Sequence, residues 1–177
     1  MTPSPTLRPI SEADVPAVLG LNHRHVDLLS PLDAERLLWL VGVSDHADVV
    51  EVDERVVGFV LTMAPGSEYD SENYRWHAER YDDAFYYLDR IVIAEEMRRR
   101  GLAGFVYDAM EDVARRFGRM TLEVNVDPPN HGSLAFHERR GYVEVGRLGE
   151  PGHVVGLMAK ELSDKAWCPV GDPRGVT

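Results

Sequence analysis

More than any other part of the sequence, Tyr87–Gly104 constrains the fold; it reads YLDRIVIAEEMRRRGLAG. The apolar run Ile91–Ile93 is typical of a buried strand, and a short polar link joins it to Arg98–Gly104, which carries two glycines. A helix that begins here leaves the N–H groups of its first turn without intrahelical acceptors, and its peptide dipoles place partial positive charge at that end. The strand, the glycine-bearing turn and the helix start together predict a site for a phosphate-like anion.

The segment after this turn has the periodicity of an amphipathic helix. Apolar residues recur at steps of three and four, and Gly118 is the predicted stop. Because Gly101 and Gly104 have no Cβ, ligand oxygens could approach the main chain closely, and three consecutive arginines before them add positive charge. The apolar stripe consists of Leu102, Phe105, Val106, Ala109, Met110, Val113 and Phe117.

Composition limits the classes of protein to which the chain could belong. Its 177 residues suit one domain, expected over residues 1–162 and followed by a tail over 163–177. The net charge of −11 argues against general nucleic-acid binding, which needs clustered cations. No apolar run approaches the roughly 20 residues that span a bilayer, and the N-terminus has no secretion signal, so we expect no membrane partner and a cytoplasmic location. The single cysteine, Cys168, cannot form an internal disulfide, and no cluster suggests a metal.

Strands and helices alternate along the chain. The sequence predicts strands at residues 7–9, 49–52, 56–63, 120–126, 142–145 and 154–162, with residues 146–152 as the last loop. Helices are predicted after Ser11, near residues 32–41 and from Asn130 to Gly141. Residues 65–83 are polar but contain four aromatic side chains, so we interpret them either as a loop or short helix at the mouth of a site, or as a surface excursion.

Two blocks of sequence resemble the GCN5-related N-acetyltransferase (GNAT) superfamily. In the first, Arg98, Gly101 and Ala103 match its diphosphate signature: Gln or Arg, two variable residues, Gly, one variable residue, then Gly or Ala. The second block, NHGSLAFHERRGYVEVG at residues 130–146, is similar to the family's asparagine-containing helix and the strand that follows. The resemblance covers about residues 6–162. It implies an α/β acyltransferase fold in which helices flank a mixed, largely antiparallel central sheet.

The resemblance also implies acetyl-CoA as co-substrate and an amine-bearing acceptor. In the family, free main-chain groups of the strand before the signature pair with the pantetheine arm, and N–H groups of the turn and first helical residues hold the diphosphate. Arg98 could instead shape the loop. The asparagine contacts the cofactor arm, and two residues of its helix lie near the thioester. Carried over to this sequence, the cofactor-binding residues are Ile91, Val92, Ile93, Arg98, Arg99, Arg100, Gly101, Leu102, Ala103, Gly104, Asn130, Ser133 and Phe136.

Three side chains are candidates for the proton transfers. An amine attacks a thioester only in its neutral form, so a base is needed, and an acid can protonate the departing thiolate. Glu123 lies where some relatives carry a catalytic glutamate, whereas Asp89 has the same strand parity as Ile91 and Ile93 and is expected on their face of the sheet. Either carboxylate could be the base, and Asp89 could instead pair with Arg90. His137 stands where many relatives have an acidic tyrosine, so it could be the acid or only line the site.

The sequence therefore predicts direct transfer of an acetyl group from acetyl-CoA to a primary amine, since no cysteine lies near either block to carry the acyl group. A small-molecule acceptor is expected, although amino acids and protein N-termini remain open, as does homodimerisation, which is common in the superfamily. A non-catalytic acyl-CoA-binding sensor is the alternative, because His137 replaces the usual tyrosine. A nucleotide-phosphate binder is weaker, because the Lys-Ser/Thr ending of a P-loop is missing.

Overall fold

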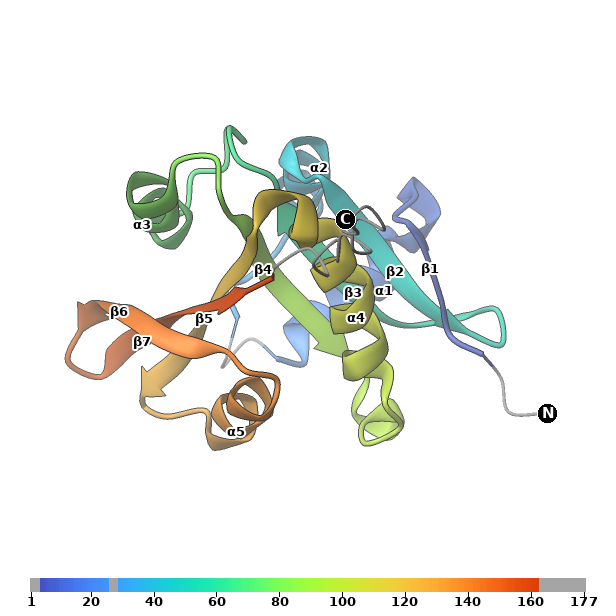
Figure 1. Ribbon diagram of the computed structural model, residues 1–177. Helices are drawn as coiled ribbons and strands as arrows, with labels where there is room; N and C mark the ends of the chain where they lie inside the picture. The colour runs from blue at the N-terminus through green and yellow to red at the C-terminus, as the bar shows by residue number, and fades with distance from the viewer. Residues whose placement is uncertain (1–3, 26–28, 163–177) are drawn as a thin grey trace, which may run out of the picture.

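A computed structural model describes residues 4–25 and 29–162, which form a seven-stranded sheet in the order β1-β2-β3-β4-β5-β7-β6, flanked by helices (Figure 1). Every neighbouring pair of strands is antiparallel except β4 and β5. This arrangement confirms the predicted mixed, largely antiparallel α/β sheet. The strands are β1 Thr6–Pro9, β2 His46–Val52, β3 Arg55–Met63, β4 Tyr86–Ile93, β5 Arg119–Asp127, β6 Val143–Glu150 and β7 His153–Glu161. The helices are α1 Val15–His23, α2 Ala34–Val43, α3 Glu72–Tyr81, α4 Leu102–Ala114 and α5 His131–Arg139.

The core consists of two apolar layers, one on each face of the sheet. On one face, the predicted stripe of α4 packs on β4 and β5 through residues such as Val106 and Met110, and Phe117 continues it after the helix. On the other face, α1 and α2 cover β3 and β4 through Leu21 and Leu37. Gly118 ends the α4 segment with a φ of 83°, a left-handed conformation that glycine adopts without strain, as predicted.

The parallel pair β4 and β5 diverges soon after it begins. Only Tyr86 and Tyr87 are paired with β5, opposite Met120 and Thr121. From Leu88 onward the two strands separate, so the sheet opens as a V at its centre (Figure 1). The edges of this opening carry main-chain groups that an extended ligand could pair with.

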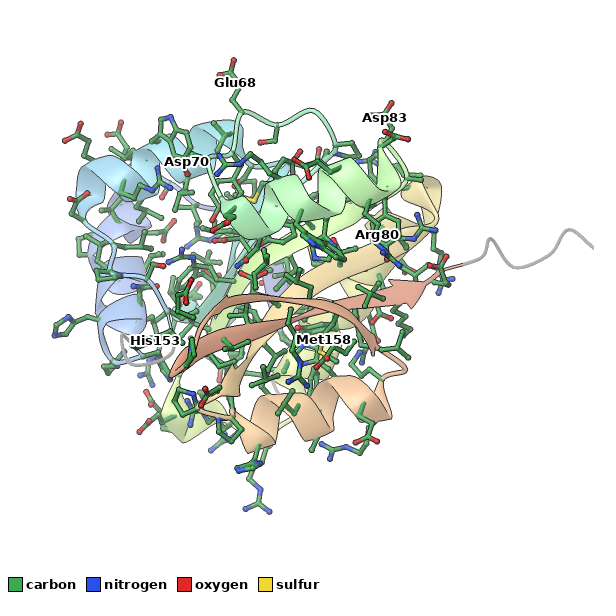
Figure 2. All side chains as sticks on the ribbon, turned by 90° about the vertical axis from the view of Figure 1, so that its left-hand side faces the viewer. Glu68, Asp70, Arg80, Asp83, His153 and Met158 are labelled. Carbon is green, nitrogen blue, oxygen red and sulfur yellow. The ribbon has the colours of Figure 1, made fainter. Side chains whose placement is uncertain are left out.

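One sequence prediction changes in the structure. The predicted loop at residues 146–152 is mostly strand, because β6 continues to Glu150 and pairs with β7 as far as His153. Residues 65–83 contain α3, which lies across the sheet beside the β6–β7 hairpin, with Glu68 and Asp83 pointing outward (Figure 2). The predicted tail at 163–177, including Cys168, lies outside the described residues. Among the described helices, none combines the length and apolar character needed to cross a bilayer.

Contacts with distant parts of the chain hold α3 in place. The indole ring of Trp76 lies against Gly146 of β6, so closely that a Cβ there would be 2.5 Å from a ring carbon. The neighbouring His77 is fully buried among Tyr81, Phe85 and Tyr87. Within residues 4–25 and 29–162, neither of its ring nitrogens has a hydrogen-bond partner of good geometry. Burial lowers the pKa of His77 to about 4, although the nearby Leu122 backbone acts in the opposite direction.

We expect His77 to make the stability of the protein depend on pH. The folded-state pKa lies below the usual 6.5, so the stabilisation is complete above pH 6.5 and is lost as the pH falls toward 4. The full loss is on the order of 3 kcal/mol. His77→Phe keeps the aromatic contacts but cannot titrate. Its free energy of unfolding should therefore fall less than that of wild type when the pH is lowered. Urea unfolding at pH 7.5 and pH 4.5 measures the free energy of unfolding of both proteins. If it fell equally in both between these pH values, His77 would not be the source of the pH dependence.

Candidate active site

A cavity of about 930 Å³ fills the opening between β4 and β5. Residues from the link between α1 and α2, the segment before α3, both diverging strands, the turn before α4, and α5 line it. Of the residues predicted from the sequence, fifteen line this cavity: Asp89, Ile91, Val92, Ile93, Arg98, Arg99, Gly101, Leu102, Ala103, Gly104, Glu123, Asn130, Ser133, Phe136 and His137. The remaining one, Arg100, is exposed and lies outside it.

At one end of the cavity lies the turn that leads into α4. Gly101 caps the helix with a φ of 80°, which a residue with a Cβ rarely adopts. The amide of Phe105 is the first to bond within the helix, to the Gly101 carbonyl at 2.9 Å. The amides of Leu102, Ala103 and Gly104 therefore have no intrahelical acceptor, and they lie at the positive end of the helix dipole. The turn therefore has the free amides that an anion site needs, and anion binding itself stays a prediction.

The side chain of Arg98 lines the cavity but also contacts two protein side chains. Its guanidinium lies 2.5 Å from Nε2 of His25, beyond the end of α1, and 3.8 Å from the Glu95 carboxylate. His25 Nδ1 in turn donates to the Leu21 carbonyl at 2.9 Å, which leaves Nε2 as the acceptor. These contacts support the interpretation that Arg98 shapes the loop.

A β-bulge changes the predicted position of Asp89. The β3–β4 register pairs Leu61 with Arg90 but Thr62 with Leu88, so Asp89 is the extra residue. The alternation along β4 is interrupted here, and the prediction that Asp89 shares a face with Ile91 and Ile93 is wrong. Those isoleucines pack on the α4 side, whereas Asp89 accepts a hydrogen bond from Tyr69 on the opposite side.

Each oxygen of the Asp89 carboxylate already accepts a hydrogen bond from a protein group. Besides the bond from the Tyr69 hydroxyl, it receives Arg90 Nε at 2.7 Å, and both charged side chains of this pair are about 5% exposed. The alternative that Asp89 pairs with Arg90 is thus confirmed.

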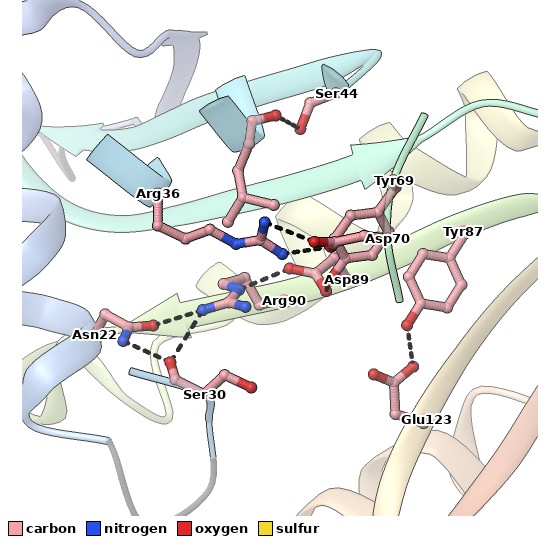
Figure 3. Close-up of polar contacts among 11 residues, drawn as sticks. Asn22, Ser30, Arg36, Ser44, Tyr69, Asp70, Tyr87, Asp89, Arg90 and Glu123 are labelled. Atoms are coloured by element: carbon pink, nitrogen blue, oxygen red, sulfur yellow. Dashed lines mark hydrogen bonds and ion pairs between the residues drawn. The ribbon is translucent and has the colours of Figure 1, made fainter. Parts of the chain in front are cut away.

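Glu123 has a different environment. It lies on β5 two residues beyond the last β4–β5 pair, on the same face as Tyr87, whose hydroxyl donates to its Oε2 at 2.6 Å (Figure 3). Glu123 is only partly exposed, and it lines the cavity. Burial, and then the nearby Asp89 charge, raise the pKa of Glu123 to about 8, while Tyr87 and Asn73 oppose the rise by hydrogen bonding to the carboxylate.

The imidazole of His137 is buried, and both of its nitrogens are engaged. Nδ1 donates to the Ser133 carbonyl at 2.7 Å, so Nε2 accepts from the Tyr107 hydroxyl at 2.5 Å. Burial lowers the pKa of His137, which favours the neutral ring at physiological pH. Asn130, at the start of the same helix, accepts a hydrogen bond from the Ser133 amide at 3.1 Å and so also caps α5.

With the geometry established, the chain can be compared with known proteins. Its sequence matches the profile of the Acetyltransferase (GNAT) family over residues 20–142. The chain belongs to this family. Members transfer an acetyl group from acetyl-CoA, so the GNAT assignment predicted from the sequence is confirmed.

Several solved structures share the fold at low sequence identity, and at these identities the likeness shows the fold alone. Ard1 from Thermoplasma volcanium has a TM-score of 0.72 and 19% identity, covering 90% of this chain and 99% of that one. The ribosomal-protein-S18-alanine N-acetyltransferase from Escherichia coli gives 0.68 and 16%, covering 93% and 97%. A structure of yncA from Salmonella typhimurium with its cofactor acetyl-CoA gives 0.67 and 16%, covering 95% and 99%. No curated protein sequence matches the chain significantly.

The cavity of this GNAT protein fits the family's cofactor. Its open strand edges suit an amide-bearing arm, and the free amides at the start of α4 suit a diphosphate. A Cβ at Gly104 would meet nothing closer than Arg140 at 3.9 Å, so the approach to the helix is open. No group of three or more candidate metal ligands occurs in the described part of the chain.

Several lining residues escaped the sequence analysis. Tyr107 follows Gly104 by three residues, so helical spacing alone could have placed it one turn above the anion site. Tyr69, Ser71 and Asn73 belong to the polar stretch expected at the mouth of a site, but no pattern singled them out. Ser30 comes from the α1–α2 link, whose position depends entirely on tertiary contacts.

Proposed function

We propose that this protein is an N-acetyltransferase that moves the acetyl group of acetyl-CoA directly to a primary amine, with Glu123 as the general base. One observation carries the proposal: the cavity that begins at the anion-binding turn ends at a carboxylate whose pKa is raised to about 8. Such a group is partly ionised near neutral pH, so it can accept the proton that the attacking nitrogen loses.

The cofactor would lie along the diverging strands. We assign its diphosphate to the amides from Arg99 to Gly104 and its pantetheine arm to the main chain of Ile91–Ile93. Asn130, Ser133 and Phe136 would line the arm nearer the thioester. Acetyl-CoA itself supplies the activated acetyl group.

We assign both proton transfers to Glu123. The neutral amine attacks the thioester carbonyl carbon, the C–N bond forms, and Glu123 takes a proton from the nitrogen, directly or through water. The C–S bond then breaks and the thiolate is protonated, for which the proton on Glu123 is available. We assign no acid role to His137, since its one basic nitrogen accepts from Tyr107. Asp89 is assigned to structure rather than to proton transfer, because Tyr69 and Arg90 occupy it.

Isothermal titration calorimetry with acetyl-CoA should show saturable binding at one site per chain. The same protein, assayed for thiol release against small primary amines, amino-acid amides and short peptides, should turn over at least one class, and we expect a small molecule. An absence of acetyl-CoA binding would end the proposal.

The sensor alternative has one observation in its favour: the position of the usual acid holds a neutral histidine that is already hydrogen-bonded. Acetyl-CoA binding without thiol release for any amine would support the sensor. Turnover of one amine would exclude it.

A further inference from the structure

Arg90 is a buried cation that contacts three separate segments of the chain. It lies on β4 directly after the bulge, and its side chain is only 6% exposed. Its Nε donates to Asp89 Oδ2 at 2.7 Å, and one terminal nitrogen donates to Asn22 Oδ1 at 3.1 Å and to the Ser30 carbonyl at 3.3 Å (Figure 3). A charge this buried is tolerated because these partners satisfy it.

The contacts of Arg90 extend to two walls of the cavity, at the end where Asp89 and Glu123 lie. We call this the acceptor end, because the proposed base is there. Asn22, which is 1% exposed near the end of α1, also donates through Nδ2 to the Ser30 carbonyl at 3.1 Å. On the other side, Asp89 accepts from Tyr69 in the segment before α3. Ser30 and Tyr69 both line the cavity, so one guanidinium joins its two outer walls to the bulge.

Arg90 and its partners lie at the end of the cavity where the proposed base is, and far from the proposed diphosphate site. Asp89 and Glu123 each lie two residues beyond the last β4–β5 pair, Tyr87 and Thr121, and so at the closed end of the V. The α4 turn, with its anion site, lies at the other end of β4. A change at Arg90 should therefore disturb the walls around the acceptor while leaving the diphosphate site intact.

We propose that Arg90 is a positioning residue that holds the α1–α2 link and the Tyr69 segment against the β4 bulge and thereby sets the geometry of amine binding. The proposal rests on the function proposed above and deepens it. Arg90 does not need to touch the reacting atoms. Its planar fork meets acceptors in two directions, a geometry that a lysine ammonium on a flexible stem does not reproduce.

Two variants test the link from opposite ends. Arg90→Lys keeps the charge beside Asp89 but loses the fork, and Asn22→Leu keeps the Arg90–Asp89 pair but removes its connection to α1. The probe is the amine with the fastest thiol release in the panel. For Arg90→Lys we expect its KM to rise about tenfold, consistent with the loss of hydrogen bonds to a charged group. We expect kcat within about threefold and the acetyl-CoA Kd within about twofold of wild type. Asn22→Leu should raise KM in the same direction by a smaller factor.

Lys160→Met is the matched control. Lys160 of β7 makes a 2.8 Å ion pair with the buried Glu111 of α4, away from the cavity, so the variant should lose stability without a change in KM. An unchanged KM in both test variants, an equal rise in Lys160→Met, or an acetyl-CoA Kd weakened as much as the amine KM would overturn the proposal.

Hydrogen exchange separates a failure of this inference from a failure of the proposed function. If wild type releases no thiol with any amine, the proposed function fails. Amide hydrogen exchange still tests whether Arg90 holds the α1–α2 link and the Tyr69 segment in place. Arg90→Lys should speed amide exchange at residues 19–24, 29–33 and 66–71 but not in α4. Equal exchange in wild type and variant would overturn the positioning role even if both proteins bind acetyl-CoA.

Discussion

Glu123→Gln is expected to lower kcat for the amine acceptor by about 10²–10⁴-fold, the usual contribution of a positioned general base. The amide keeps the volume of the side chain and can still accept a hydrogen bond from Tyr87, so the cavity should keep its shape. Acetyl-CoA affinity should stay within a factor of about two. Steady-state thiol release measures kcat, and calorimetry measures the affinity for acetyl-CoA. A kcat within threefold of wild type would show that Glu123 is not the base.

The pH profile provides a second test of the same residue. The base acts when ionised, so kcat/KM of wild type should rise with pH and level off above about 8, and Glu123→Gln should lack this rise. Tyr87→Phe is the matched control, because it removes a hydrogen bond that stabilises the carboxylate and should move the rise to higher pH.

The raised pKa of Glu123 should also make the stability of the folded protein depend on pH, independently of catalysis. In the folded protein Glu123 holds its proton to about pH 8, whereas an exposed glutamate loses it near 4.5, so its contribution to stability falls as pH rises through this window. Glu123→Gln should reduce that fall, which chemical denaturation at pH 5 and pH 8.5 can detect.

Ala103→Phe should weaken acetyl-CoA binding by tenfold or more. Ala103 lies in the first turn of α4 and lines the cavity, and a benzyl group there would occupy the space in front of the free amides. Because the helix still starts at the Gly101 cap, far-UV circular dichroism should be unchanged. Calorimetry with acetyl-CoA measures the effect.

Ala103→Ser is the control for this experiment. It adds a single oxygen at the same position and should bind within about threefold of wild type. If the phenylalanine variant bound as tightly as the serine variant, the diphosphate would have to lie away from the α4 turn.

The parts that the sequence predicted well depend on local interactions. The apolar stripe of α4 and the glycine caps at Gly101 and Gly118 follow from helical spacing and from the conformations that glycine allows. The turn residues that the resemblance marks as cofactor-binding line the cavity, except Arg100, and their contact with the cofactor stays a prediction. The β4–β5 opening was expected only by resemblance, because nothing in Ile91–Ile93 differs from an ordinary buried strand.

The features that the sequence missed or left open depend on contacts between distant residues. The bulge at Asp89 arises from register with Leu61 and Thr62 on β3, and a strict alternation along β4 could not reveal it. The engagement of His137 depends on Tyr107, thirty residues earlier in the chain, and could not be predicted from helical spacing within α5. Likewise, Trp76 places α3 by packing on Gly146 of a strand seventy residues later.

The early separation of β4 from β5 also bears on how such a sequence can change over time. A ligand held by main-chain groups makes few demands on the side chains that flank it, provided they remain apolar and extended. In the binding mode that we propose, the strand and turn that hold acetyl-CoA therefore tolerate extensive substitution, while the cavity walls that Arg90 joins depend on particular side chains. New acceptors would then arise by altering Asn22, Ser30 or Tyr69, with the machinery that delivers the acetyl group left as it is.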